Sequence, residues 1–120
     1  MENEILDLEK MLFKYDYISN KEWLENVIHD DFIECGKSGY LFKKAETVES
    51  LLECKEDRNV VIYNYDCNKI DTNTWIVHYI TCVDNIDKYY RTSIWVKEQN
   101  LKLIFHQASK YFEDVNLERF

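Results

Sequence analysis

This sequence of 120 residues contains only two glycines and no proline. Because these residues supply most turns and loops, their scarcity argues against long segments without regular structure. No apolar run approaches the length needed to cross a bilayer, and the opening Met-Glu-Asn-Glu lacks the features of a signal peptide. The sequence therefore predicts one cytoplasmic domain that spans residues 1–120.

Basic residues are also few, since 15 Lys and Arg stand against 23 Asp and Glu and leave a net charge of −8. Nucleic-acid phosphates and anionic membrane surfaces are both bound through basic clusters. We therefore expect neither nucleic acid nor membrane as a partner. A protein with a basic surface remains a candidate partner for such an acidic chain.

The sequence also lacks recognisable metal and cofactor motifs. The four cysteines form no C-x-x-C pair, and without a secretion signal they are expected to be reduced thiols. The three histidines lie at a predicted helix end and on two separate strands, so no metal site is predicted. The two glycines, separated by Lys37 and Ser38, cannot form the phosphate loop of a nucleotide cofactor, so no cofactor is expected.

The first half of the chain does contain apolar residues at helical spacing. One stripe predicts a helix over residues 5–15. Ser19-Asn-Lys-Glu22 has the form of a capping box. Ser19 is then the N-cap of a second helix, which is predicted to end near His29. His29 is then a C-terminal cap favoured by the helix dipole. A third helix is predicted over residues 44–53.

From Asn59 onward the apolar period changes to two. Four strands rich in Tyr, Ile, Val and Trp are predicted over residues 60–66, 75–83, 89–97 and 101–112. Their short polar connections are typical of an antiparallel meander. Two shorter strands, over residues 32–36 and 40–42, are predicted around the glycine turn.

Several of these strands are apolar on both faces, and helices can cover only one face of a sheet. The second face must be covered by the curled sheet, by the C-terminal tail or by another subunit. We therefore predict a homodimer through the outer sheet face that includes some of Ile76, Ile80, Ile94 and Val96.

Residues 91–109 are the most informative segment, because polar side chains are embedded there in otherwise apolar strands. Buried polar groups need partners or a cavity to face, so the segment predicts a pocket. The length of the turn decides the pairing of the two strands. A four-residue loop places Arg91 opposite His106, a three-residue loop places it opposite Gln107, and the sequence leaves both open.

The predicted pocket residues combine polar strand residues with aromatic and histidine side chains: Arg91, Ser93, Trp95, Gln107, His78, Tyr63, Tyr65 and Trp23. His106 is the candidate catalytic base, since imidazole titrates near neutrality, or else a neutral core histidine that holds a hydrogen-bond partner. Arg91 is suited either to a substrate carboxylate or to an acidic residue at the rim. The tyrosines either donate hydrogen bonds into a cavity or simply pack.

Three segments together resemble the nuclear transport factor 2-like superfamily, and within it the SnoaL-like branch of uncharacterised bacterial domains. They are Asp31-Phe-Ile-Glu-Cys-Gly-Lys-Ser-Gly39, Arg91-x-Ser93-x-Trp95 and Ile104-Phe-His-Gln107. The resemblance covers residues 4–110. It implies a cone-shaped α+β fold, with N-terminal helices packed on a strongly bent antiparallel sheet, a pocket at the wide end and homodimers through the sheet. It implies no single activity.

Three hypotheses of function follow. The leading one is a protein that binds a small molecule in the cone pocket, through an apolar and aromatic lining with a few polar anchors. The alternative is a lyase, isomerase or hydrolase that needs no cofactor and uses His106 or His78 as its base. The third is an acidic, immunity-type module that binds a basic protein.

Overall fold

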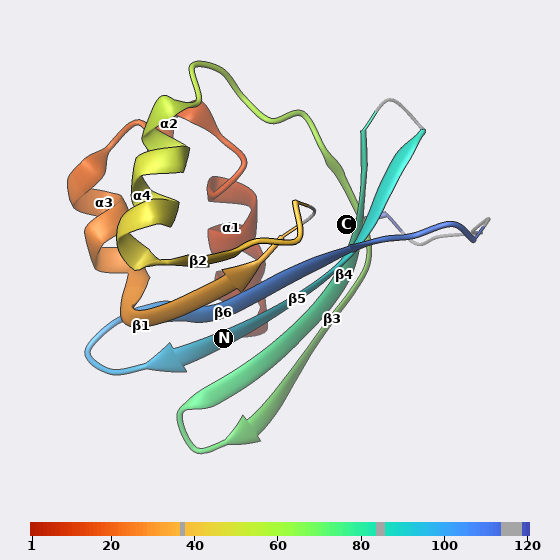
Figure 1. Cartoon of the computed structure of the whole chain (residues 1–120). Helices are drawn as coiled ribbons and strands as arrows, with labels where there is room; N and C mark the ends of the chain where they lie inside the picture. Colours follow the sequence, from red (N-terminus) through yellow and green to blue (C-terminus); the bar gives the residue numbers. More distant parts are fainter. Residues whose placement is uncertain (37, 84–85, 114–118) are drawn as a thin grey trace.

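The computed structural model describes residues 1–36, 38–83, 86–113 and 119–120. The helices are α1 (Glu2–Met11), α2 (Tyr15–Ile18), α3 (Lys21–Val27) and α4 (Lys44–Glu53). The strands are β1 (Ile28–Cys35), β2 (Leu41–Lys43), β3 (Val61–Asp71), β4 (Thr74–Val83), β5 (Asp87–Lys97) and β6 (Leu101–Lys110). They form one sheet in the order β2-β1-β6-β5-β4-β3, and the helices lie together on one side of it (Figure 1).

The sheet is antiparallel except at one place, where β1 runs parallel to β6. This pair joins the N-terminal half of the chain to its last strand, so Ile33, Glu34 and Cys35 lie beside Phe105, His106 and Gln107. The short turns predicted an antiparallel meander for the later strands, and the family resemblance implied an antiparallel sheet. The parallel pair is formed by segments far apart in the chain, and local patterns do not report such pairs.

The predicted start and end of the second helix were wrong. Its N-cap is Asn20, whose side-chain oxygen accepts a hydrogen bond of 3.1 Å from the amide of Trp23, and not Ser19. The helix ends at Val27, because Ile28 is already extended and pairs with Leu103 of β6. His29 therefore lies in β1 and not at a helix C-terminus. The predicted first helix is likewise divided into α1 and α2, whereas α4 has the predicted bounds.

The hairpin of β5 and β6 has a three-residue loop, since Lys97 pairs with Leu101. A β-bulge then shifts the register between Ile94 and Trp95, and Arg91 lies opposite Ala108. Both predicted pairings of Arg91 are therefore wrong. The extra residue of the bulge moves every later pair by one position, which places His106 directly opposite Ser93.

The two faces of the sheet differ in environment. Trp75, Val77 and Tyr79 of β4 are buried on the face that the helices cover. Ile76 and its cross-strand neighbour Ile94 point to the other face, where they are half-buried. The apolar residues of both faces were predicted, and the structure shows which face contains the core. No helix in the described part of the chain is long and apolar enough to cross a membrane.

Candidate functional site

A cavity of about 110 Å³ lies between the helices and the covered face of the sheet. Its apolar lining includes Leu12, Phe13, Ile28, Phe32, Leu51 and Leu103. Its polar lining includes Glu9, Glu34, Thr47, Arg58, Tyr79, Arg91 and His106. Apolar walls with a few polar groups are the usual composition of a small-molecule site.

Glu9 forms the back of this cavity and is 1% exposed. Its carboxylate accepts hydrogen bonds from the Tyr79 hydroxyl at 2.5 Å and from Nε1 of Trp95 at 2.7 Å. The Ser93 hydroxyl is a third hydrogen-bonding partner. Burial raises the pKa of Glu9 above its ordinary value, although these hydrogen bonds and the charge of Arg91 oppose the shift. The site therefore contains a desolvated acid held by fixed donors.

His106 is held between Arg91 and Ser93. Nη1 of Arg91 lies 3.2 Å from Nε2 of His106, and Nδ1 of His106 lies 3.0 Å from the Ser93 hydroxyl. A guanidinium group only donates, so Nε2 accepts and Nδ1–H donates to Ser93. Burial lowers the pKa of His106 to about 3, and the charges of Arg91 and Arg58 contribute to the shift. The histidine is therefore neutral at physiological pH.

These contacts form one ordered chain of hydrogen bonds. Because the Ser93 oxygen accepts from His106, its own hydrogen is available to the Glu9 carboxylate. The chain runs from Arg91 through His106 and Ser93 to Glu9, and it joins β5, β6 and α1. It fixes the orientation of Arg91 relative to the buried acid.

The cavity opens toward a wider outer hollow of about 530 Å³. Five residues line both spaces, and we call them the arginine collar: Phe13, Glu34, Arg58, Arg91 and His106. Nε of Arg91 donates to the Thr81 hydroxyl at 2.8 Å, and Nη2 of Arg58 donates to the carbonyl of Leu12. Both guanidinium groups lie over the ring of Phe13. Their Cζ atoms are 4.8 Å (Arg58) and 5.3 Å (Arg91) from the centroid of the ring.

The charges of the collar strongly affect one another. Burial lowers the pKa of Arg58, and the like charge of Arg91 lowers it further. Burial raises the pKa of Glu34, and the two arginines only partly offset this shift. The collar therefore combines two guanidinium groups with one carboxyl group whose ionisation is opposed by burial.

Two buried polar atoms beside the cavity have no hydrogen-bond partner among the described residues: Oγ1 of Thr47 and Nε of Arg58. Thr47 is 6% exposed and lies on α4, whereas Arg58 lies in the segment between α4 and β3. Both residues line the cavity. Unpartnered polar atoms are uncommon in protein interiors, so this pair marks a place where a bound group can form hydrogen bonds.

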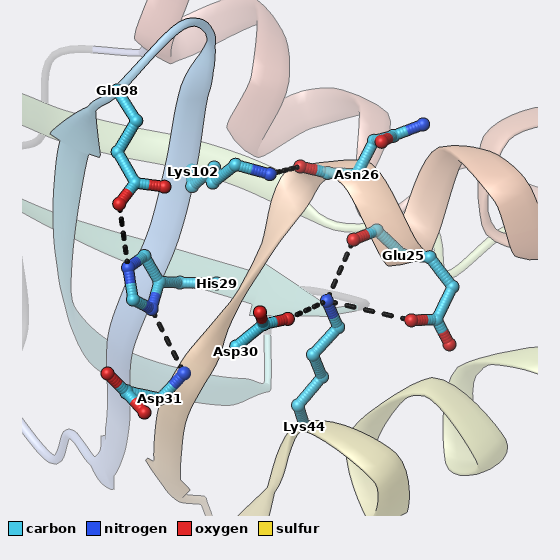
Figure 2. A network of polar contacts seen from close by, with 8 residues as sticks. All are labelled: Glu25, Asn26, His29, Asp30, Asp31, Lys44, Glu98 and Lys102. Carbon is cyan, nitrogen blue, oxygen red and sulfur yellow. Dashed lines mark hydrogen bonds and ion pairs between the residues drawn. The ribbon is translucent and has the colours of Figure 1, made fainter.

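The wall that α4 contributes to the cavity is fixed at the start of that helix. Nζ of Lys44 donates to the carbonyl of Glu25 at 2.8 Å and to the Asp30 carboxylate at 2.9 Å (Figure 2). His29 accepts from the Asp31 amide at 3.0 Å. This network ties α4 to α3 and β1, and none of its residues lines the cavity. Its role is to position Thr47 and Leu51, which follow on α4.

Four of the predicted site residues meet on the covered face of the sheet. Arg91 and His106 line the cavity, and Ser93 and Trp95 hold Glu9 at its back. Tyr65 is on the same face but outside the cavity lining, and its hydroxyl donates to the carbonyl of Glu2 at 3.2 Å.

The other predicted site residues lie elsewhere. His78 and Gln107 are on the opposite face of the sheet, each beside Thr92, and Nδ1 of His78 is 3.1 Å from the Thr92 hydroxyl. Tyr63 pairs with Ile80 on that same face. Trp23 lines a separate groove of about 350 Å³ with residues of α1 and of the β5–β6 turn. Strand alternation separates these side chains from the cavity.

Sequence reasoning missed several residues of the site, and some of them carried a signal. Glu9 follows Ile5 by four residues and precedes Phe13 by four, so it lies on the apolar stripe of the first helix. Glu34 alternates with Phe32 and therefore shares its face of β1. Arg58 lies in a segment with no periodic pattern, and nothing in the sequence indicated it.

Among residues 1–36, 38–83, 86–113 and 119–120, no three His, Cys, Asp or Glu side chains come together in a way that could hold a metal ion. The absence of a metal and of a cofactor remains a prediction from the sequence. Cys35, Cys54, Cys67 and Cys82 are all free thiols.

A curved mixed sheet with helices packed on one face places the chain among the α+β proteins. No family model matches the sequence, and no curated protein is significantly similar to it. Solved structures identify the particular fold, which is nuclear transport factor 2-like, as the sequence predicted.

One of these structures is a nuclear transport factor 2-like protein from Cytophaga hutchinsonii, with a TM-score of 0.74 and 23% identity over 91% of this chain and 97% of that one. Another is such a protein of unknown function in nutrient uptake from Rhodospirillum rubrum, with a TM-score of 0.69 and 15% identity over 92% and 96% of the two chains. A protein of unknown function from Pectobacterium atrosepticum has a TM-score of 0.76 and 13% identity over 92% of this chain and 87% of that one. At these identities the likeness shows the fold alone.

Proposed function

We propose that this protein binds a small molecule in the cavity and the outer hollow. The observation that carries the proposal is a pair of buried atoms beside the cavity, Oγ1 of Thr47 and Nε of Arg58, that have no partner among the described residues. A bound molecule with a polar group would provide their missing partners, and its apolar part would replace contacts with water.

The state of His106 supports binding rather than catalysis by this residue. Both of its ring nitrogens are engaged, and its low pKa makes it a weak base at physiological pH. In this proposal His106 orients Arg91 and Ser93, while the cavity supplies the binding surface.

A screen of small fragments by nuclear magnetic resonance tests this proposal. The fragments should include anionic, neutral and cationic compounds, and the signals followed should be those of residues that line the cavity, such as Thr47 and Leu51. We expect at least one class to shift these signals. Leu51→Phe should weaken binding at least about tenfold because it fills the cavity.

Leu52→Phe is the matched control, because Leu52 is adjacent to Leu51 but lines a groove on the other side of α4. It should leave binding unchanged. A screen in which no fragment shifts the cavity signals, or in which Leu51→Phe has no effect on binding, would show that the cavity is not a ligand site.

A second candidate is an enzyme that transfers protons without a cofactor. The observation that favours it is Glu9, a buried carboxyl with a raised pKa at the back of the cavity. In this reading Glu9 would take a proton from carbon next to a carbonyl group of the ligand, and solvent would return one. Incubation of bound fragments in D₂O should then exchange that proton, and Glu9→Gln should abolish the exchange. If the proton is not exchanged, the second candidate fails.

Other predictions from the sequence stay predictions. They are the cytoplasmic location, membership of the SnoaL-like branch and the immunity-type alternative, for which the site offers no specific support.

A further inference from the structure

We infer that the ligand of this cavity is a small organic carboxylate, held through its carboxylate group between Arg58 and Arg91. The inference rests on the proposed function and adds the chemical class of the ligand. It is drawn from the charges of the arginine collar, the free nitrogens of its two guanidinium groups and the apolar lining behind them.

The first step concerns charge. The two guanidinium groups line the same junction between the cavity and the outer hollow and repel each other. Within the part of the chain that the structure describes, neither of them forms an ion pair with a carboxylate. The chain as a whole has 23 acidic against 15 basic residues, so many acidic partners exist elsewhere. Two partly buried cations that share only the carboxyl group of Glu34 leave a positive charge that an anion can neutralise.

The second step concerns geometry. Arg91 is fixed through Nε and Nη1, which bind Thr81 and His106. Arg58 is fixed through Nη2, which binds the carbonyl of Leu12, and its Nε is buried without a partner among the described residues. Each guanidinium group therefore retains donors while its orientation is set by the protein. Planar groups oriented in advance bind a carboxylate with little loss of entropy.

The third step excludes anions of higher charge. Glu34 belongs to the collar and Glu9 lies at the back of the cavity, so a second negative charge on the ligand would meet two carboxyl groups. A monoanion avoids most of this repulsion. The apolar lining, which includes Phe32, Leu51 and Leu103, then accommodates a short apolar body. The chemistry is that of a small monocarboxylate and not of a phosphate ester.

The test is a titration followed by nuclear magnetic resonance with matched pairs of ligands. Butanoate is compared with butanamide, and benzoate with benzamide, because each amide has nearly the shape of its acid without the charge. We expect the carboxylates to shift the signals of the cavity and the collar and to bind at least about tenfold more tightly than the amides.

The variants assign the binding to the arginines. Arg91→Gln and Arg58→Gln should each weaken butanoate or benzoate binding at least about tenfold and change amide binding less than about twofold. Lys21→Gln removes the same charge from an exposed position on α3 and should have no effect. Arg91→Lys keeps the charge but loses the planar fork, so it should recover only part of the affinity. If Arg91→Gln fails to fold, the affinity of Arg91→Lys still tests whether the guanidinium group of Arg91 binds the carboxylate.

Four outcomes would overturn the inference itself. If neutral or cationic fragments bind in the cavity and carboxylates do not, the ligand class is wrong and the proposed function stands. Equal binding of acid and amide, or unchanged carboxylate binding in both glutamine variants, would also refute it. If inorganic phosphate binds the collar more tightly than butanoate does, the site selects another anion. If no fragment of any class binds, the proposed function itself fails.

Discussion

A single residue, Glu9, determines much of the character of this site. It lies on an apolar helix stripe and is almost fully buried, where its carboxylate binds Tyr79, Trp95 and Ser93. Burying a carboxylate is costly even when fixed donors surround it, and the raised pKa of Glu9 shows that the donors do not fully compensate. A buried acid that lines a cavity is more readily understood as part of a functional site than as part of a core.

The raised pKa makes a prediction about stability and pH. The folded pKa of Glu9 lies above its unfolded value of 4.5, so its protonated form is favoured in the folded protein. Stability is therefore fully present at low pH and is lost as the pH rises through the folded pKa. Glu9→Gln cannot ionise. The free energy of unfolding of the wild type relative to this variant should fall as the pH rises from about 4.5 through the raised pKa of Glu9, by about 1.4 kcal/mol for each unit by which the pKa is raised.

Urea denaturation of both proteins across that pH range measures this difference. Glu49→Gln is the matched control, because Glu49 is exposed on α4, and its difference from the wild type should vary much less with pH. If the gap between wild type and Glu9→Gln stays constant with pH, Glu9 does not have a raised pKa in the folded protein.

At the scale of elements, the bulge in the last hairpin decides which side chains meet. Without it, the three-residue loop would place Arg91 opposite Gln107. With it, His106 lies opposite Ser93 on the covered face, and Gln107 is exposed on the other face. Sequence patterns located both strands and their polar residues correctly. They could not locate the bulge, because an extra residue in a strand changes the pairing without changing the composition.

The start of α3 gives a prediction that separates the sequence pattern from the structure. The side chain of Asn20 caps this helix through the Trp23 amide. Asn20→Ala should therefore lower the free energy of unfolding by about 1 kcal/mol, the usual cost of a lost N-cap. Ser19→Ala should change it by less than about 0.5 kcal/mol. Urea denaturation of the two variants distinguishes the possibilities, and a larger effect at Ser19 would support the capping box that the sequence predicted.

At the scale of the whole molecule, the fold was more predictable than the site. Helix stripes and strand alternation predicted the order of helices and strands, because each reports a local preference repeated along the chain. The three short segments added the family resemblance that implied a nuclear transport factor 2-like fold. The site instead combines α1, β1, α4, the segment that contains Arg58, and the last three strands. Its members lie far apart in sequence, and their convergence depends on the parallel pairing of β1 with β6 and on the bulge.

The face of the sheet opposite the helices leads to the last prediction. Ile33 is 43% exposed there, and its neighbours across the sheet, Phe105, Ile94 and Ile76, are only half-buried. Four apolar side chains in a row across adjacent strands form a continuous patch, and such patches mark interaction surfaces. Ile80, which the sequence had offered for this surface, is 3% exposed and can contribute little.

We propose that a second copy of the chain covers this patch. Light scattering at high micromolar concentration should then give twice the monomer mass of 14.6 kDa. Ile94→Asp should shift the mass to that of the monomer, because it places an unpaired charge in the centre of the apolar contact. Tyr15→Asp is the control, since Tyr15 is 39% exposed on α2, on the side of the sheet opposite the patch, and it should leave the dimer intact. A wild-type mass of 14.6 kDa would refute the dimer, and loss of the dimer in Tyr15→Asp alone would place the interface on the helix side.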